Sequence, residues 1–99
     1  MIRIISINVN GIRSAEKKGL FGWLKYQRAN IICLQEVRAS STQIESESFH
    51  LKGLQRFLVE AEKPGYSGVA VYTKDEPIRT INKIGDKEFD AEGRYIEVE

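Results

Sequence analysis

The chain has 99 residues, of which 41% are hydrophobic and 29% are charged, and its formal net charge at pH 7 is +1. This composition argues against a disordered segment and allows at most one domain, and the small net charge provides no overall field for nucleic acid. A single cysteine, Cys33, excludes an intrachain disulfide, so we expect a buried thiol and a cytoplasmic location. No apolar run is long enough to span a bilayer and the first residues lack a signal-peptide pattern, so no membrane partner is expected.

The first predicted unit is a strand, a helix and a second strand. Residues 2–9 are rich in isoleucine and valine at both parities, which predicts a strand buried on both faces. Residues 14–29 show helical spacing of apolar side chains, although Gly19 and Gly22 weaken the pattern. Residues 31–35 form a continuous apolar run that predicts a second buried strand. This order predicts a unit with two parallel strands and a right-handed crossover.

The middle of the chain is predicted to be less regular. Residues 39–50 are polar and read as a loop with at most one helical turn, and residues 51–60 combine a short helical turn with a strand. Residues 68–73 predict a strand. A turn over residues 74–77 then leads to a partner strand at residues 78–84.

The last part of the chain is predicted as an acidic loop over residues 85–93, followed by a strand over residues 94–99. The sequence stops inside that strand. A strand at a terminus exposes unpaired backbone groups, so we expect the chain to be an incomplete fragment.

Polar residues follow both strands of the first unit. Asn8 and Asn10 stand at the end of the first strand, with matching parity, and Glu36 follows the second. Because ligands bind at the carboxyl ends of parallel strands, these three side chains are expected to converge. Amide and carboxylate oxygens suit magnesium. The competing interpretation is that both asparagines cap a turn and Glu36 is a solvated loop acid, and spacing alone favours it.

Four segments, in order, resemble the exonuclease III / apurinic-apyrimidinic (AP) endonuclease family. They are SINVNGIR at residues 6–13, IICLQE at residues 31–36, GYSGVA at residues 65–70 and EFDAEGR at residues 88–94. Each motif alone is modest, but the ordered set covers nearly the whole chain. Three positions depart from the pattern: Ile7 where tryptophan is common, Asn30 where aspartate is frequent, and Arg38 where lysine is common.

The resemblance implies an α/β fold that is part of a four-layer α/β sandwich, with two packed mixed β-sheets and outer helices. Residues 1–99 would be the N-terminal portion of a single endonuclease/exonuclease/phosphatase domain, ending in mid-strand. The implied function is a magnesium-dependent DNA-repair phosphodiesterase, with manganese as a substitute, that cleaves duplex DNA at abasic sites or 3′ ends. The family's water-activating residues lie beyond Glu99, so a C-terminal half or a second chain would complete the site.

The resemblance also assigns roles to individual residues. Glu36 would be the acidic magnesium ligand, Asn8 would be a catalytic residue beside the metal and the scissile phosphate, and Asn10 would offer a neutral carbonyl oxygen to the metal.

Four further residues would contact DNA: Arg13, Arg38, Gly65 and Tyr66. Three of them have a structural alternative. Arg13 could be a surface arginine at a helix start, Arg38 could pair with the acidic site, and Tyr66 could be a core aromatic.

Three more positions have a structural interpretation. Glu92 and Arg94 are expected to form an ion pair that orders their loop, and Gly68 is expected to allow a close backbone approach.

Two other functions remain open. One is a non-catalytic module derived from this fold that binds DNA or protein. The other is a family member that acts on phosphoinositides or RNA, although the motifs at residues 8–13 and 65–70 favour DNA repair.

Overall fold

The centre of the protein is a four-stranded mixed sheet with the strand order β1-β2-β4-β3. The structure is a computed structural model that describes residues 2–99. The strands are β1 (Ile4–Asn8), β2 (Ile31–Gln35), β3 (Gln55–Val59) and β4 (Val69–Thr73). Strand β1 runs parallel to β2, whereas β4 is antiparallel to both β2 and β3. The predicted parallel pair is therefore confirmed, and an antiparallel hairpin extends it into a mixed sheet.

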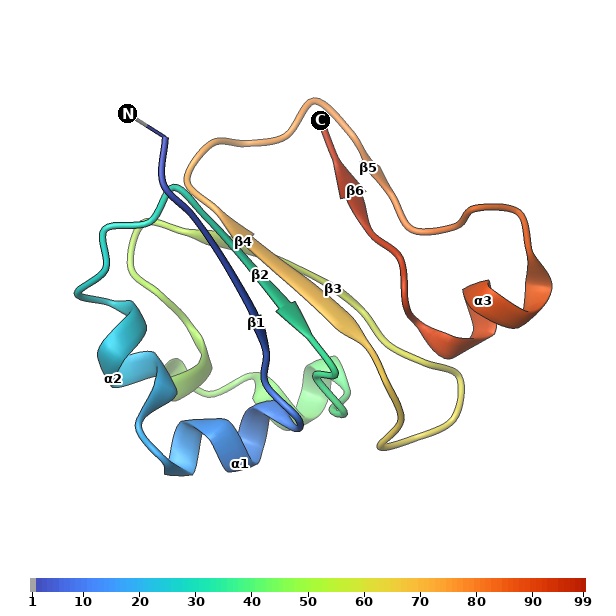
Figure 1. Ribbon diagram of the computed structural model, residues 1–99, viewed down its shortest axis with the longest axis horizontal. Helices are drawn as coiled ribbons and strands as arrows, with labels where there is room; N and C mark the ends of the chain where they lie inside the picture. Colours follow the sequence, from blue (N-terminus) through green and yellow to red (C-terminus); the bar gives the residue numbers. More distant parts are fainter. Residues whose placement is uncertain (1) are drawn as a thin grey trace.

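Two short helices, α1 (Ile12–Lys17) and α2 (Leu20–Leu24), occupy the crossover between β1 and β2 (Figure 1). The single helix expected over residues 14–29 is wrong, because Gly19 adopts a left-handed backbone with φ of 96° between them. Glu16 bridges the break, since its Oε1 accepts the main-chain N–H of Phe21 at 3.0 Å. Both helices lie on one face of the sheet.

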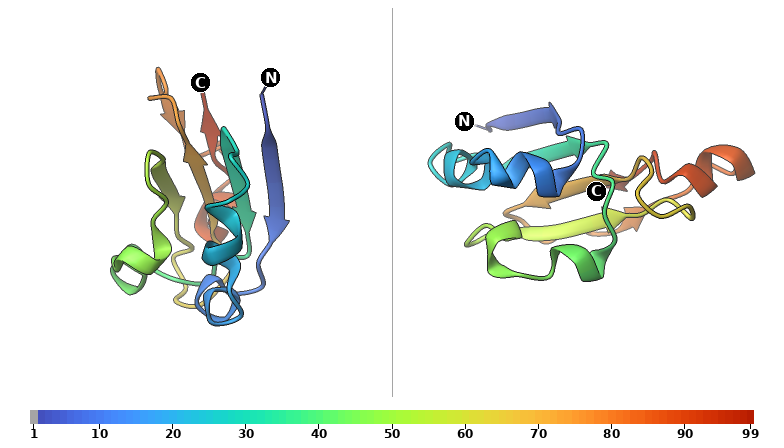
Figure 2. Two further views of the ribbon diagram at one scale, coloured as in Figure 1. Left: turned by 90° about the vertical axis from the view of Figure 1, so that its left-hand side faces the viewer. Right: turned by 90° about the horizontal axis from the view of Figure 1, so that it is seen from below.

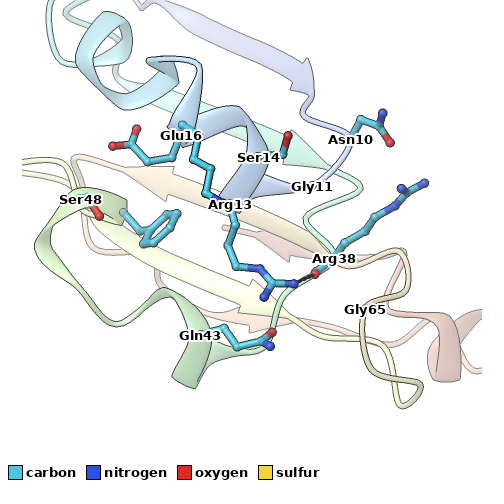
Figure 3. Close-up of a pocket in the computed structure, with 11 residues that line it drawn as sticks. Asn10, Gly11, Arg13, Ser14, Glu16, Arg38, Gln43, Ser48 and Gly65 are labelled. Atoms are coloured by element: carbon cyan, nitrogen blue, oxygen red, sulfur yellow. Dashed lines mark hydrogen bonds between the residues drawn. The ribbon is translucent and has the colours of Figure 1, made fainter.

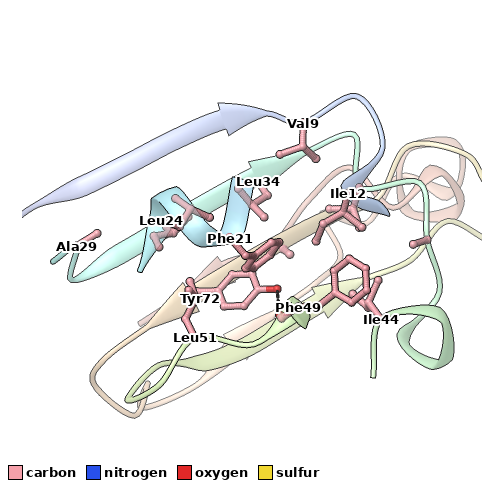
Figure 4. Close-up of a cluster of buried hydrophobic side chains, with 14 residues drawn as sticks. Val9, Ile12, Phe21, Leu24, Ala29, Leu34, Ile44, Phe49, Leu51 and Tyr72 are labelled. Carbon is pink, nitrogen blue, oxygen red and sulfur yellow. Dashed lines mark hydrogen bonds between the residues drawn. The ribbon is translucent and has the colours of Figure 1, made fainter. Parts of the chain in front are cut away.

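An aromatic cluster fills the space between this helical layer and the sheet (Figure 4). The ring of Phe21 meets those of Phe49 and Tyr72 edge-on, with centroids 5.9 and 5.8 Å apart. The fully buried Tyr72 donates its hydroxyl to the carbonyl oxygen of Phe49 at 2.8 Å. Buried tyrosine hydroxyls need such a partner, and this bond ties the polar segment containing Phe49 to the sheet.

Strand β1 is an edge strand, and its burial differs from the prediction. Ile5 and Ile7 pack against the core, but Ile4 on the other face is 61% exposed. The same alternation leaves Cys33 of β2 half-buried rather than buried. The prediction that the first strand is buried on both faces is therefore wrong, although its isoleucines point to both. The helices cover only one face of β1 and β2.

The segment from residue 74 onward departs most from the sequence prediction. Strands β5 (Thr80–Ile81) and β6 (Glu97–Val98) pair with each other in antiparallel fashion. The expected pairing of residues 78–84 with β4 is wrong, since β2 and β3 already occupy both edges of β4. Of the strand predicted over residues 94–99, only Glu97 and Val98 form regular strand structure, and Glu99 adds backbone hydrogen bonds to Arg79. This β5–β6 ribbon faces the side of the main sheet opposite to α1 and α2 (Figure 1, Figure 2).

Short helical elements replace two of the predicted loops. The polar segment carries two 3₁₀ turns, Ser41–Ile44 and Glu47–Phe49, where at most one was expected. Helix α3 (Lys87–Glu92) replaces the acidic loop. Asp86 caps α3 by accepting the N–H groups of its first turn, and Gly93 ends it with a left-handed backbone. No helix within residues 2–99 has both the length and the apolar character needed to cross a bilayer.

Candidate functional site

Asn8 and Glu36 meet where the parallel strands β1 and β2 end. Asn8 lies opposite Gln35, the last residue of β2, so the residue that follows this strand, Glu36, comes beside the asparagine side chain. Asn8 donates its Nδ2 to Glu36 Oε2, and its Oδ1 accepts the main-chain N–H of Asn10 at 3.0 Å. The structure thus brings together two of the three residues predicted to converge.

Glu36 also forms an ion pair with Arg38. Arg38 Nη2 lies 2.8 Å from Glu36 Oε1, and the two side chains remain 45% and 35% exposed. The alternative interpretation of Arg38 as a partner of the acidic site is therefore realised. An exposed pair of this kind contributes little to folding, so the guanidinium can exchange partners at low cost.

These contacts set the charge state of Glu36. The hydrogen bond from Asn8 lowers the pKa of the Glu36 carboxyl, and partial desolvation opposes that effect. The hydrogen bond and positive charge of Arg38, and more weakly the charge of Arg94, lower the pKa further. Glu36 is therefore a carboxylate at neutral pH, a state that attracts cations.

The loops around Glu36 hold an unusual number of left-handed residues. Asn10, Glu36, Arg38 and Ser67 have φ of 47°, 52°, 53° and 39°. Backbone hydrogen bonds connect the loops that contain these residues. Gly11 N–H donates to Glu36 O at 2.8 Å, and Arg38 N–H donates to Ser67 O at 2.7 Å. Strained backbone of this kind concentrates at functional sites, where surrounding contacts maintain it.

A second feature is an open hollow of about 790 Å³ beside α1 (Figure 3). Arg13 lies in its wall and donates Nη2 to the carbonyl oxygen of Arg38 at 3.4 Å. Arg38 and Gly65 also line it. The remaining lining residues are Asn10, Gly11, Ser14, Glu16, Lys17, Gln43, Ser48 and Phe49. Its arginines and lysine give the hollow a mainly positive wall.

Asn10 separates from the other two predicted ligands. Strand β1 ends at Asn8, so the strand parity that would align Asn10 with it no longer applies. Asn10 instead lines the hollow beside α1, and within residues 2–99 its side chain makes no hydrogen bond to Glu36. The parity argument was wrong, while the metal-binding role of Asn10 stays a prediction.

Gly65 and Tyr66 project from the loop between β3 and β4. Tyr66 is 47% exposed and its ring lies 5.1 Å from Lys63 Nζ, so it is not a core aromatic. Both residues line a small hollow that also contains Glu36 and Arg38. Gly68 behaves as expected: with φ of 87°, a Cβ there would lie 3.4 Å from Val59 O.

The sequence analysis interpreted Arg94 only as a structural residue, and the structure also brings it to the candidate site. Its expected ion pair with Glu92 is present, with Arg94 Nε 2.5 Å from Glu92 Oε2. Arg94 also lines both small hollows next to Glu36, together with Ser67. Arg94 is the last residue of the EFDAEGR motif. Its proximity to Glu36 could not be predicted from the motif, because it depends on how the chain after β4 folds back toward the end of β2.

The donor set around Glu36 can be compared with that of a metal site. Within residues 2–99, no three His, Cys, Asp or Glu side chains come together. Glu36 and Asn8 supply a carboxylate and an amide, the hard oxygen donors that magnesium accepts. They fit a hydrated cation that takes its remaining ligands from water and from a bound anion.

The fold and these motifs are similar to those of known nucleases. An exodeoxyribonuclease of Bacillus subtilis (strain 168) is 42% identical over 101 residues, covering 99% of this chain and 38% of that protein. The DNA repair nuclease APEX1 of Danio rerio is 33% identical over 103 residues, covering 99% of this chain and 32% of that protein. The chain therefore spans about a third of the length of these curated relatives.

A solved structure supports the same relationship. The AP endonuclease from Archaeoglobus fulgidus superimposes with a TM-score of 0.82 at 28% identity, over 99% of this chain and 37% of that one. It shares the mixed α/β arrangement described above. Residues 5–97 match the profile of the Endonuclease/Exonuclease/phosphatase family, and the chain belongs to that family.

Proposed function

We propose that this chain forms the N-terminal part of a magnesium-dependent DNA-repair phosphodiesterase that acts on duplex DNA at abasic sites or 3′ ends. The observation that carries the proposal is the Glu36 carboxylate, held by Asn8 and flanked by Arg38 and Arg94. A single anionic oxygen ligand among guanidinium groups suits a cation and a phosphate bound together. The names of the relatives, an exodeoxyribonuclease and AP endonucleases, support this choice of reaction.

Glu36 and Asn8 would hold the magnesium ion, with Asn10 as a further oxygen donor and manganese as a substitute. The bound ion would neutralise charge on the phosphate and the leaving oxygen. Glu36 supplies the negative charge, and Asn8 orients its carboxylate through Nδ2. Arg38 would leave Glu36 and bind the incoming phosphate, because its exposed ion pair is weak and both groups are accessible.

The positive wall beside α1 would contact the DNA backbone. Arg13 and Arg38 would bind phosphates there, as guanidinium groups match phosphate geometry. Gly65 and Tyr66 would approach the backbone from the loop between β3 and β4, where Tyr66 is accessible.

The four-layer sandwich remains part of the proposal. The β5–β6 ribbon would begin the second sheet, since it faces the side of the main sheet that the helices leave open (Figure 1). Residues 1–99 would then be the N-terminal portion of one domain, completed by a C-terminal half or a second chain. That completing part would supply the groups that position the attacking water.

The metal site can be tested directly on the chain. Manganese should broaden the NMR signals of Asn8 and Glu36 more than those of other residues. We expect its affinity to be low, because only one carboxylate binds it. Glu36→Gln should abolish this localised broadening, whereas Glu76→Gln, at an exposed acid in the turn after β4, should not. Equal broadening in wild type and Glu36→Gln would remove Glu36 as a ligand.

The alternative function is a non-catalytic module that binds DNA or protein. It is supported by the finding that no three His, Cys, Asp or Glu side chains within residues 2–99 come together as a metal site. DNA binding that is independent of the metal and of Glu36 would favour this module over the phosphodiesterase.

A further inference from the structure

The position of Arg94 is fixed by an unusually close backbone approach. Gly93 has φ of 63°, and a Cβ there would lie 2.5 Å from Ala61 N. Beside it, Glu62 N–H donates to Ala91 O at 2.8 Å. These contacts press the end of α3 against the segment that follows β3. The next residue, Arg94, thereby lies near the carboxyl end of β2, beside Glu36.

The guanidinium of Arg94 is held on one side and accessible on the other. Its Nε donates to Glu92 Oε2 at 2.5 Å, and the side chain is 46% exposed. Within residues 2–99, the guanidinium of Arg94 makes this one hydrogen bond, through Nε. Its two terminal nitrogens, Nη1 and Nη2, are therefore available to a ligand. Arg94 shares two hollows with Glu36 and Ser67, and one of them also contains Asn8.

The charges around Glu36 indicate what these nitrogens would bind. Glu36 is already paired with Arg38, and Arg94 adds a second cation nearby. A divalent cation alone would be repelled by both guanidinium groups. A phosphate would remove that repulsion, because its oxygens can contact the metal and the arginines together.

We propose that Arg94 is a phosphate-positioning residue that binds a backbone phosphate of nucleic acid beside Glu36, while Glu92 fixes its orientation. This inference rests on the proposed function, since it concerns the phosphate of the same site. This role of Arg94 differs from that of an ion pair that only orders the loop, because the two terminal nitrogens of Arg94 would bind a ligand.

The first test measures binding of the chain to a fluorescent duplex with one abasic analogue, by anisotropy in magnesium at several salt concentrations. Arg94→Gln should weaken binding about tenfold and lower the salt slope by about 1, as expected for one lost phosphate contact. Arg79→Gln is the matched control, because Arg79 is also an exposed arginine paired with a glutamate, Glu99, next to the β5–β6 ribbon. It should leave both quantities unchanged.

The second test measures manganese binding without DNA. Arg94→Gln removes a cation near Glu36, so manganese affinity should stay equal or increase while DNA affinity falls. A role in loop order alone predicts that both affinities fall together, and that result would overturn the proposal. An Arg94→Gln variant that binds DNA like Arg79→Gln would also overturn it.

Arg94→Lys covers the case in which Arg94→Gln fails to fold, as judged by circular dichroism. Lysine keeps the charge but loses the two-pronged geometry, so it should retain the salt slope and lose affinity. Wild-type affinity for Arg94→Lys would count against the inference. If wild type binds manganese at Glu36 but no duplex, the inference fails while the metal site stands; if wild type binds neither, the proposed function fails with it.

Discussion

Asn8 uses both ends of its side-chain amide, donating Nδ2 to Glu36 and accepting the main-chain N–H of Asn10 through Oδ1 at 3.0 Å. One asparagine therefore connects the end of β1, the turn that follows it and the carboxylate at the end of β2. Any change at Asn8 should be detected at Glu36, although the two residues belong to different strands.

Asn8→Ala should raise the pKa of Glu36 toward its ordinary value, because the hydrogen bond from Asn8 is the largest cause of its lowering. The carboxyl carbon shift of Glu36, followed by NMR against pH, measures this change. Asn30→Ala is the control, since Asn30 accepts the N–H of Arg3 at the other end of the strands. An unchanged Glu36 pKa in Asn8→Ala would mean that Arg38 dominates.

The same shift has a consequence for stability. The folded-state pKa of Glu36 lies below its unfolded value, so its contribution to stability is present above the unfolded pKa. That contribution is lost as the pH falls through the lowered, folded pKa. Asn8→Ala should therefore reduce the difference in stability between neutral and acidic pH.

Arg13→Ala should weaken duplex binding and lower its salt slope by about 1, because a phosphate contact releases counterions. Tyr66→Ala should weaken binding without changing the slope, since Tyr66 carries no charge. Fluorescence anisotropy at several salt concentrations measures both effects. Lys25→Ala serves as the control because Lys25 is exposed at the end of α2 and does not line the hollow that contains Arg13. An Arg13→Ala variant with wild-type affinity and slope would refute the assignment.

The 99-residue chain alone should not nick an abasic duplex at a rate comparable to its relatives. Phosphodiester hydrolysis needs a positioned water as well as charge neutralisation, and Glu36 is the one carboxylate among the described residues that line the two small hollows at the site. The assay follows a fluorescent duplex in magnesium and in chelator, with the Bacillus subtilis exodeoxyribonuclease as positive control. Magnesium-dependent nicking by the chain, lost in Glu36→Ala, would show that its site is already complete.

Gly93→Ala should destabilise the fold more than Gly85→Ala. Both glycines have left-handed φ, 63° and 94°, so each alanine costs about 1 kcal/mol of backbone strain. A Cβ at Gly93 would also collide with the backbone of Glu60 and Ala61, whereas a Cβ at Gly85 meets no atom within 4 Å. We expect a further loss of at least about 1 kcal/mol at Gly93. Urea unfolding measures both, and equal losses would argue against the close approach.

The sequence predicted the part of the site that local pattern determines. Two apolar strands joined by a helical crossover pair in parallel, so Asn8 and Glu36 had to meet at one edge. The position of Asn10 could not be read in the same way, because it depends on the left-handed backbone after β1. Arg94 was harder still, since its place follows from the close contact between Gly93 and Ala61.

Secondary structure shows the same division between local and distant causes. Helix α3 was missed because acidic residues suggested a solvated loop, although Asp86 and Gly93 are ordinary signals for a helix start and end. The pairing of β5 with β6 could not be predicted, because nothing in the sequence of residues 78–84 prevents them from pairing with β4. They do not pair with it because β2, which is distant in sequence, already occupies the edge of β4 that β3 leaves open.

The strand order also sets a sequence of events during folding. Strands β3 and β4 are joined by a short connection, whereas β2 must find β4 across a long intervening segment. Contacts between distant residues are entropically costly to form, so the β3–β4 hairpin should close early and the central β2–β4 pairing should limit the rate. Asn8 and Glu36 come together when β1 docks on β2. The backbone beside Glu36 is anchored when β2 docks on β4, because Arg38 N–H then bonds to Ser67 O. A partly folded chain would therefore lack the corner at which we propose that the metal binds.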